Sequence, residues 1–151
     1  MVLNLNLGAG SNRRQDYISV DYYTNADVVH DLTQPLPYED VDNIYACHVI
    51  EHFSYAEWQD IKEYWADALK VGGSLEIRCP DIILACEKFL SDPTDHFSMQ
   101  ILYGNQSTPG EYHKNGHTVQ SLIKDFPGFK CEVLEPATDY ELHLKLTKEQ
   151  A

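Results

Sequence analysis

The chain begins with a short apolar run that ends in a glycine turn, and two further short apolar runs each end in an aspartate. The first run covers residues 2–7 and stops at Gly8-Ala9-Gly10, the second covers 18–20 and stops at Asp21, and the third stops near Asp31. Such runs predict β-strands, and glycines at a strand end let the backbone turn sharply and approach a ligand closely. Three successive strand ends therefore offer a glycine turn and two carboxylates.

The rest of the chain alternates between predicted strands and helices. Strands are expected at 43–49, 74–80, 129–135 and 140–148, the last with the alternation of a half-buried antiparallel strand. Helices are expected at 54–70, ended by Gly72-Gly73, at 81–92 and at 119–126. Residues 92–117 lack periodicity and predict a long loop. The pattern favours a single domain over 1–151, with a three-layer, Rossmann-like α/β fold and a mostly parallel sheet.

The composition argues against nucleic acid and anionic membranes as partners and favours a cytoplasmic protein. The chain has 24 acidic and 11 basic residues and a net charge of -13, which disfavours binding to nucleic acid or to an anionic membrane. We expect neither a signal peptide nor a membrane span. The four cysteines form no C-x-x-C pair and lie in apolar stretches, so we expect reduced core thiols and a cytoplasmic protein.

The glycine turn favours a nucleoside that carries no phosphates. A dinucleotide fingerprint needs a third glycine at a helix start, but that position is Arg13, and no G-K-[ST] occurs. This disfavours a nicotinamide oxidoreductase. Asp21 follows Gly10 too closely for a full helix between them, so the first helices are expected to be reduced. A carboxylate at the second strand end is the group that accepts two ribose hydroxyls.

Several stretches resemble the motifs of class I S-adenosylmethionine-dependent methyltransferases, and more narrowly a short type-11-like group. They are LNLGAGS, ISVDYY, VVHDLTQPLPY, IYACHVIEHF, LKVGGSLEIRCPD and EYHKNGHT. The resemblance implies S-adenosylmethionine as cofactor, with the methionine part over residues 8–10, the ribose on Asp21 and the adenine near Asp31 and Leu32. It also implies that Cys47 and His48 face the sulfonium. The cofactor-binding residues that it implies are Asn6, Gly8, Ala9, Gly10, Asp21, Tyr22, Asp31, Leu32, Cys47 and His48.

His48, Glu51 and His52 have the H-x-x-E-H spacing of one class of zinc peptidases. That site needs both histidines on one helix, whereas His48 ends a predicted strand and the next helix begins at Ser54. We therefore expect no metal and no zinc hydrolase. Glu51 and His52 either cap the helix or let His52 act as a general base. His113 is the second candidate base, in a loop that either is solvated or folds over the methyl group.

The function predicted from these features is methyl transfer to a small-molecule or glycan-linked acceptor, at oxygen. The chain lacks an Asn/Asp-Pro-Pro-Tyr motif after the fourth predicted strand, which argues against amino groups of bases. The main alternative is a non-catalytic module or partner subunit that binds S-adenosylmethionine or its demethylated product. Reduced first helices would expose the cofactor, and formation of a homo-oligomer could cover that edge.

Overall fold

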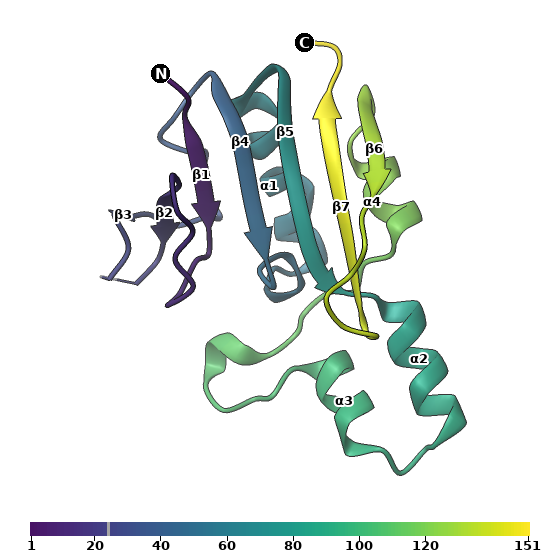
Figure 1. Ribbon diagram of the computed structural model, residues 1–151. Helices are drawn as coiled ribbons and strands as arrows, with labels where there is room; N and C mark the ends of the chain where they lie inside the picture. The colour runs from purple at the N-terminus through teal and green to yellow at the C-terminus, as the bar shows by residue number, and fades with distance from the viewer. Residues whose placement is uncertain (24) are drawn as a thin grey trace.

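The computed structural model describes residues 1–23 and 25–151 around a mixed β-sheet (Figure 1). Seven strands pair in the order β3-β2-β1-β4-β5-β7-β6. Neighbours from β3 to β5 are parallel, whereas β7 is antiparallel to β5 and to β6. This confirms the mostly parallel sheet with an antiparallel C-terminal strand. The strands are β1 (Asn4–Leu7), β2 (Ile18–Asp21), β3 (Val28–Val29), β4 (Val41–Cys47), β5 (Leu69–Pro80), β6 (Phe129–Val133) and β7 (Glu141–Lys148).

Helices occupy one face of the sheet and the region beyond the carboxyl end of β5 (Figure 1). The α-helices are α1 (Tyr55–Ala68), α2 (Ile82–Ser91), α3 (His96–Tyr103) and α4 (Val119–Asp125), and the 3₁₀ turns are η1 (Ile50–His52) and η2 (Pro109–Glu111). α1 and α4 share one face, because the Trp58 indole of α1 donates a hydrogen bond to Asp125 of α4 over 2.8 Å. No helix in the described ranges is long and apolar enough to cross a membrane.

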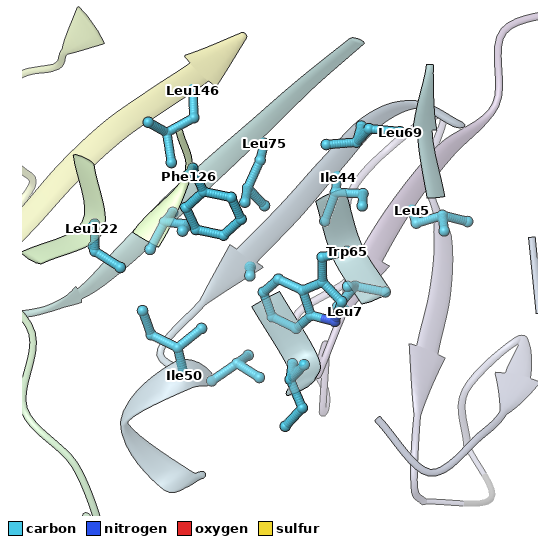
Figure 2. Packing of buried hydrophobic residues seen from close by; sticks show 14 of the residues in the cluster. Leu5, Leu7, Ile44, Ile50, Trp65, Leu69, Leu75, Leu122, Phe126 and Leu146 are labelled. Carbon is cyan, nitrogen blue, oxygen red and sulfur yellow. The ribbon is translucent and has the colours of Figure 1, made fainter. Parts of the chain in front are cut away.

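Helix α1 begins where the sequence predicts it, since Ser54 and Glu57 make a capping box at its start. The Ser54 hydroxyl accepts the Glu57 N–H over 3.2 Å, and the Glu57 carboxylate accepts the Ser54 N–H over 2.7 Å. Trp58 and Trp65 are at most 1% exposed and pack edge to face with ring centroids 5.6 Å apart. Figure 2 shows Trp65 and Phe126 among the aliphatic side chains of the core, and Trp58 belongs to the same buried cluster.

The first helices are reduced, as the sequence predicts. Residues 8–17 form turns and contain no helix. Tyr45 alternates along β4 with Ile44 and Ala46, which face α1, so the Tyr45 ring lies on the opposite face. The guanidinium of Arg14 stacks over that ring at 4.0 Å from its centroid. A side chain from the turn therefore covers part of the sheet that a helix would otherwise cover.

Two predicted boundaries are wrong. We expected Gly72-Gly73 to end the helix, but α1 ends at Ala68 and β5 begins at once, with both glycines inside the strand. A Cβ at position 73 would lie 2.9 Å from the carbonyl oxygen of Val41, so this glycine serves the close approach of β4 and β5. The third strand is also shorter than expected, and Asp31 lies in the turn that follows it.

The expectation of an unbroken loop over residues 92–117 is wrong as well, because the segment contains α3. Asp95 caps this helix by accepting the N–H groups of Phe97 and Ser98, each over 3.2 Å. Ser98 and Ile101 are buried on the side that faces the rest of the protein. The apolar stripe is too short to stand out in the sequence, and only the capping aspartate could have indicated the helix.

The cysteines do not all lie in the core, contrary to our expectation. Cys79 is buried, Cys47 and Cys131 are half-buried, and Cys86 is exposed. None forms a disulfide in the described chain. Cys86 is exposed because it lies on the outward side of the short helix α2, where Ala85 is the buried residue.

Candidate active site

A cavity of about 430 Å³ opens at the carboxyl ends of β1, β2 and β4. Ligands of parallel α/β sheets bind at this edge. Most of the predicted site residues border the cavity, namely Gly8, Gly10, Asp21, Tyr22, Asp31, Leu32, His48 and His52. The structure therefore brings together groups from strand ends and turns that are far apart in the sequence.

The glycine turn forms one wall of the cavity and is held tightly in place. Gly8 and Gly10 have φ angles of 63° and 53°, in the left-handed region that favours glycine. The N–H of Gly8 donates to the carbonyl of Val20 over 2.8 Å. A Cβ at position 8 would lie 2.5 Å from a methyl group of Val49, so only a glycine fits between the turn and this side chain.

Asp21 connects the glycine turn to the end of β2. Its side chain is largely buried, and its two carboxylate oxygens accept the N–H of Gly10 over 2.6 Å and the N–H of Tyr22 over 2.7 Å. Both bonds fix the carboxylate at the cavity wall. Each oxygen keeps a further acceptor position, so the group can still accept hydrogen bonds from a ligand in the cavity.

The other end of the cavity combines a carboxylate with an apolar surface. Asp31 is exposed, and hydrogen bonds from the hydroxyl and the N–H of Thr33 lower the pKa of its carboxyl group. Leu32 is buried beside it, and the exposed Tyr22 borders the same cavity. This end can contact a flat, partly polar ring system.

Four predicted residues do not border the main cavity. Asn6 is buried, and its amide donates to the carbonyl of Asn12 over 2.9 Å, which supports the glycine turn from behind. Ala9 is buried in the same turn. Cys47 is half-buried at the end of β4, where burial raises the pKa of its thiol. His113 lies behind His52, with their ring centroids 5.0 Å apart.

His48 lies where β4 passes into η1, with a φ of 54° that is unusual for a residue with a side chain. Its Nε2 is 3.0 Å from Oε2 of the buried Glu141, which also accepts a hydrogen bond from Arg78 over 2.7 Å. Its Nδ1 is 3.4 Å from Oε1 of Glu51. The carboxylates of Glu51 and Glu141 raise the pKa of His48 against the opposite effect of burial.

Glu51, His52 and His113 lie close together beside the main cavity, which His52 borders. Glu51 is 2% exposed, and neither of its carboxylate oxygens has a hydrogen-bond partner within residues 1–23 and 25–151. Nδ1 of His52 donates to the carbonyl of Tyr112 over 3.1 Å, and Nδ1 of His113 donates to that of Ile101 over 2.8 Å. Burial lowers the pKa of His113, which favours the neutral imidazole.

A second, smaller cavity of about 180 Å³ adjoins the main one at His48. Helix α3 supplies much of its wall, with Phe97, Gln100 and Ile101. Its other lining residues are Pro80, Asn105, His113 and Tyr140. The surface therefore combines aromatic rings with two carboxamides, and His48 stands between the two cavities.

The sequence indicated part of this lining and missed the rest. Lys114, which follows the candidate base His113, borders the main cavity, and its N–H donates to the carbonyl of Glu51 over 2.8 Å. The H-x-x-E-H pattern drew attention to Glu51, but it did not predict that this side chain is buried. The aromatic wall formed by Phe97 and Tyr140 could not be predicted, because it depends on how α3 docks.

Comparison with protein-family models and with curated protein sequences finds no match. Solved structures do match. The N-methyltransferase NodS from Bradyrhizobium japonicum WM9, in complex with S-adenosylhomocysteine, aligns with a TM-score of 0.66 at 11% identity, over 99% of this chain and 79% of that one. The plantazolicin methyltransferase BpumL, also in complex with S-adenosylhomocysteine, gives 0.64 at 12% identity, over 99% and 77%. The DhpI–SAH complex gives 0.64 at 16% identity, over 96% and 76%.

This chain has the fold of S-adenosylmethionine-dependent methyltransferases. The Rossmann-like methyltransferase fold that the motifs predict is thereby confirmed. Because these identities do not exceed 16%, the likeness concerns architecture, and activity has to be argued from the site itself.

Proposed function

We propose that this protein binds S-adenosylmethionine in the main cavity and transfers its methyl group to an oxygen of a small-molecule or glycan-linked acceptor. The observation that carries this proposal is the buried Asp21 carboxylate, fixed to the glycine turn by the 2.6 Å bond from Gly10 at the carboxyl edge of the sheet. The cavity of about 430 Å³ lies within the range of about 300–1,000 Å³ that is usual for small-ligand sites.

The cofactor would lie along the strand ends with each part next to a matching surface. The two ribose hydroxyls would donate to the free acceptor positions of Asp21. The methionine part would pass over residues 8–10, whose backbone allows close approach. The adenine would lie against Leu32, with Asp31 and Tyr22 at its edges. Asn6 and Ala9 would support the turn from behind, without contact to the ligand.

The sulfonium would lie at the end of β4, next to His48, with Cys47 behind it. Methyl transfer is an in-line displacement whose barrier falls mainly through alignment of the nucleophile, the carbon and the sulfur. The acceptor oxygen forms its bond to the methyl carbon while the carbon–sulfur bond breaks and its electron pair passes to sulfur. S-adenosylhomocysteine then leaves, and the hydroxyl proton passes to a base.

His52 is the first candidate for that base, because it borders the cavity and is hydrogen-bonded through Nδ1 to a carbonyl oxygen. Its Nε2 therefore carries the lone pair. His113 packs against it and burial lowers its pKa, which favours the neutral form, so it is the second candidate. A base is required for a hydroxyl acceptor, which is the reason for proposing oxygen as the target.

The smaller cavity supports a compact acceptor. Its volume of about 180 Å³ suits a fragment of a few rings or one sugar, and Phe97 and Tyr140 offer faces for stacking. Gln100 and Asn105 offer carboxamide groups for hydroxyls. The net charge of -13 also argues against polymeric nucleic acid as acceptor.

One observation favours a second function, a non-catalytic module that binds the same cofactor or its product. Residues 8–17 form no helix, so the cavity lacks the cover that the first helices would give. In such a module the exposed edge would be the docking surface of a partner protein, and no acceptor would react.

The test is a methyl-transfer assay with labelled S-adenosylmethionine and a panel of hydroxyl, carboxyl and amine acceptors. We expect transfer to hydroxyl acceptors and a rate about 10²–10⁴-fold lower in His52→Ala, the usual effect of a general base. The exposed His96→Ala is the matched control and should keep full activity. Cofactor binding without transfer to any acceptor would favour the binding module, and preferred transfer to amines would refute the oxygen target.

A further inference from the structure

Glu51 presents a buried carboxylate that the described residues do not neutralise by hydrogen bonding. It is 2% exposed, and both of its oxygens lack hydrogen-bond partners among residues 1–23 and 25–151. A buried carboxylate is normally paired, hydrogen-bonded or bound to a metal ion, since an isolated charge is costly to remove from water. The site therefore offers an anionic ligand atom in a place closed to solvent.

Two imidazoles lie beside this carboxylate, and Nε2 of His52 is 3.9 Å from Oε1 of Glu51. His52 and His113 each donate Nδ1–H to a main-chain carbonyl, over 3.1 Å and 2.8 Å, so the lone pair of each ring is on Nε2. Metal-bound histidines in proteins usually have this second hydrogen bond, because it fixes the tautomer and the orientation of the ring. One ligand atom from each of Glu51, His52 and His113 lies within 4.8 Å of the other two.

We propose that Glu51, His52 and His113 bind one divalent transition-metal ion, for which Zn²⁺ is the best match. Two histidines and a glutamate are the protein ligands of one class of catalytic zinc sites, which keep one position open. Zinc–ligand distances of about 2.0–2.2 Å place the ligand atoms roughly 3.4 Å apart in a tetrahedron, so small side-chain rotations would complete the site. The site differs from the peptidase pattern in two ways, because His113 replaces His48 and because Glu51 is a ligand instead of the base that activates water.

His48 provides the competing explanation. Its Nδ1 approaches Oε1 of Glu51 to 3.4 Å, and a protonated His48 could balance the carboxylate without a metal. A protonated His48 could donate through Nε2 to Glu141 over 3.0 Å and through Nδ1 to Glu51 at once, but the Nδ1 contact does not have hydrogen-bond geometry.

A metal at this place would change the role of the two histidines in the proposed methyl transfer. His52 borders the main cavity and His113 borders the smaller one, so the ion would lie between the two proposed ligand sites. An acceptor hydroxyl in the open position would lose its proton more readily, as metal-bound water does. This consequence rests on the proposed function, whereas metal binding itself does not.

The test measures zinc binding by untagged, chelator-treated protein in the absence of S-adenosylmethionine. Calorimetric titration with Zn²⁺ and elemental analysis after dialysis should both give one ion per chain for the wild type and for the exposed-histidine control His96→Ala. His113→Ala and Glu51→Gln should bind at least tenfold more weakly, since even a lost partner of a metal ligand costs about 10–100-fold. Circular dichroism would verify that each variant is folded.

A wild type that binds no stoichiometric zinc, or a folded His52→Ala/His113→Ala variant that still binds it, would overturn the proposal. If the variants do not fold, X-ray absorption of the wild-type zinc complex decides instead. Two imidazole ligands are expected, and a zinc environment without imidazole would refute the site. Cofactor binding measured with chelator present keeps this result separate from the proposed function.

Discussion

The contact between Gly8 and Val49 predicts a large and specific effect of adding one methyl group. In Gly8→Ala the new Cβ would lie 2.5 Å from Cγ2 and 2.9 Å from Cγ1 of Val49, and the residue would keep a φ of 63°. The left-handed conformation costs about 1–2 kcal/mol for a residue with a Cβ. The overpacking adds about 1–3 kcal/mol. We therefore expect a loss of about 2–5 kcal/mol in the free energy of unfolding.

Gly10→Ala is the matched control in the same turn. Gly10 has a φ of 53°, but a Cβ at this position would have no neighbouring atom within 4 Å, so only the conformational cost of about 1–2 kcal/mol applies. The difference between the two variants isolates the contact with Val49. Urea unfolding would measure both, and the melting temperature of Gly8→Ala should fall by about 2–4 °C for each kcal/mol.

The double variant Gly8→Ala/Val49→Ala tests the steric cause directly. Val49→Ala removes both methyl groups that the new Cβ would meet, so the double variant should be about 1–3 kcal/mol more stable than the sum of the single changes predicts. Equal stability of Gly8→Ala and Gly10→Ala, together with additive effects in the double variant, would refute the tight wall that we describe beneath the cavity.

Two further predictions concern the fold around the site. Ser54→Ala removes the acceptor of the 3.2 Å bond from Glu57 N–H and should lower the free energy of unfolding by about 1 kcal/mol in thermal or urea unfolding, whereas an unchanged value would contradict the capping box. Hydrogen bonds from the N–H and hydroxyl of Ser19 and from the guanidinium of Arg13 lower the pKa of Asp27. The ionised carboxylate therefore stabilises the fold at a pH above its unfolded pKa of about 3.9. That stabilisation is lost as the pH falls through the lower pKa of the folded state. The stability advantage of wild type over Asp27→Asn should therefore be constant above about pH 5 and shrink as the pH falls below the unfolded pKa, and an advantage that is unchanged at low pH would refute the shift.

The sequence predicts the strand-end half of the site because that half is locally encoded. The glycine turn, Asp21 and the absence of a first helix all follow from spacing within the first part of the chain. The end of α1 could not be read in the same way, because Gly72-Gly73 resembles a helix stop. The close approach of Gly73 to Val41 in the neighbouring strand is a tertiary cause that no local pattern contains.

The other half of the site depends on contacts between distant segments. His52 and Tyr112 are joined by a hydrogen bond across a separation of 60 residues. The position of His113 beside Glu51 follows from that contact and from α3, whose short apolar stripe gives little signal. The H-x-x-E-H spacing correctly drew attention to Glu51 and His52, but the third member of their cluster became visible only in the folded chain.

The most direct test of the proposed cofactor site is the change in thermal stability on addition of S-adenosylmethionine or S-adenosylhomocysteine. At about 100 times the dissociation constant a ligand stabilises by about 2.7 kcal/mol, or roughly 5–10 °C. We predict this shift for the wild type and for the control Asp42→Asn. Asp42 lies at the end of β4 away from the cavity, where its carboxylate accepts the N–H of Leu3. We predict loss of the shift in Asp21→Asn. No shift for the wild type with either ligand at millimolar concentration, or an equal shift in Asp21→Asn, would contradict the proposed site.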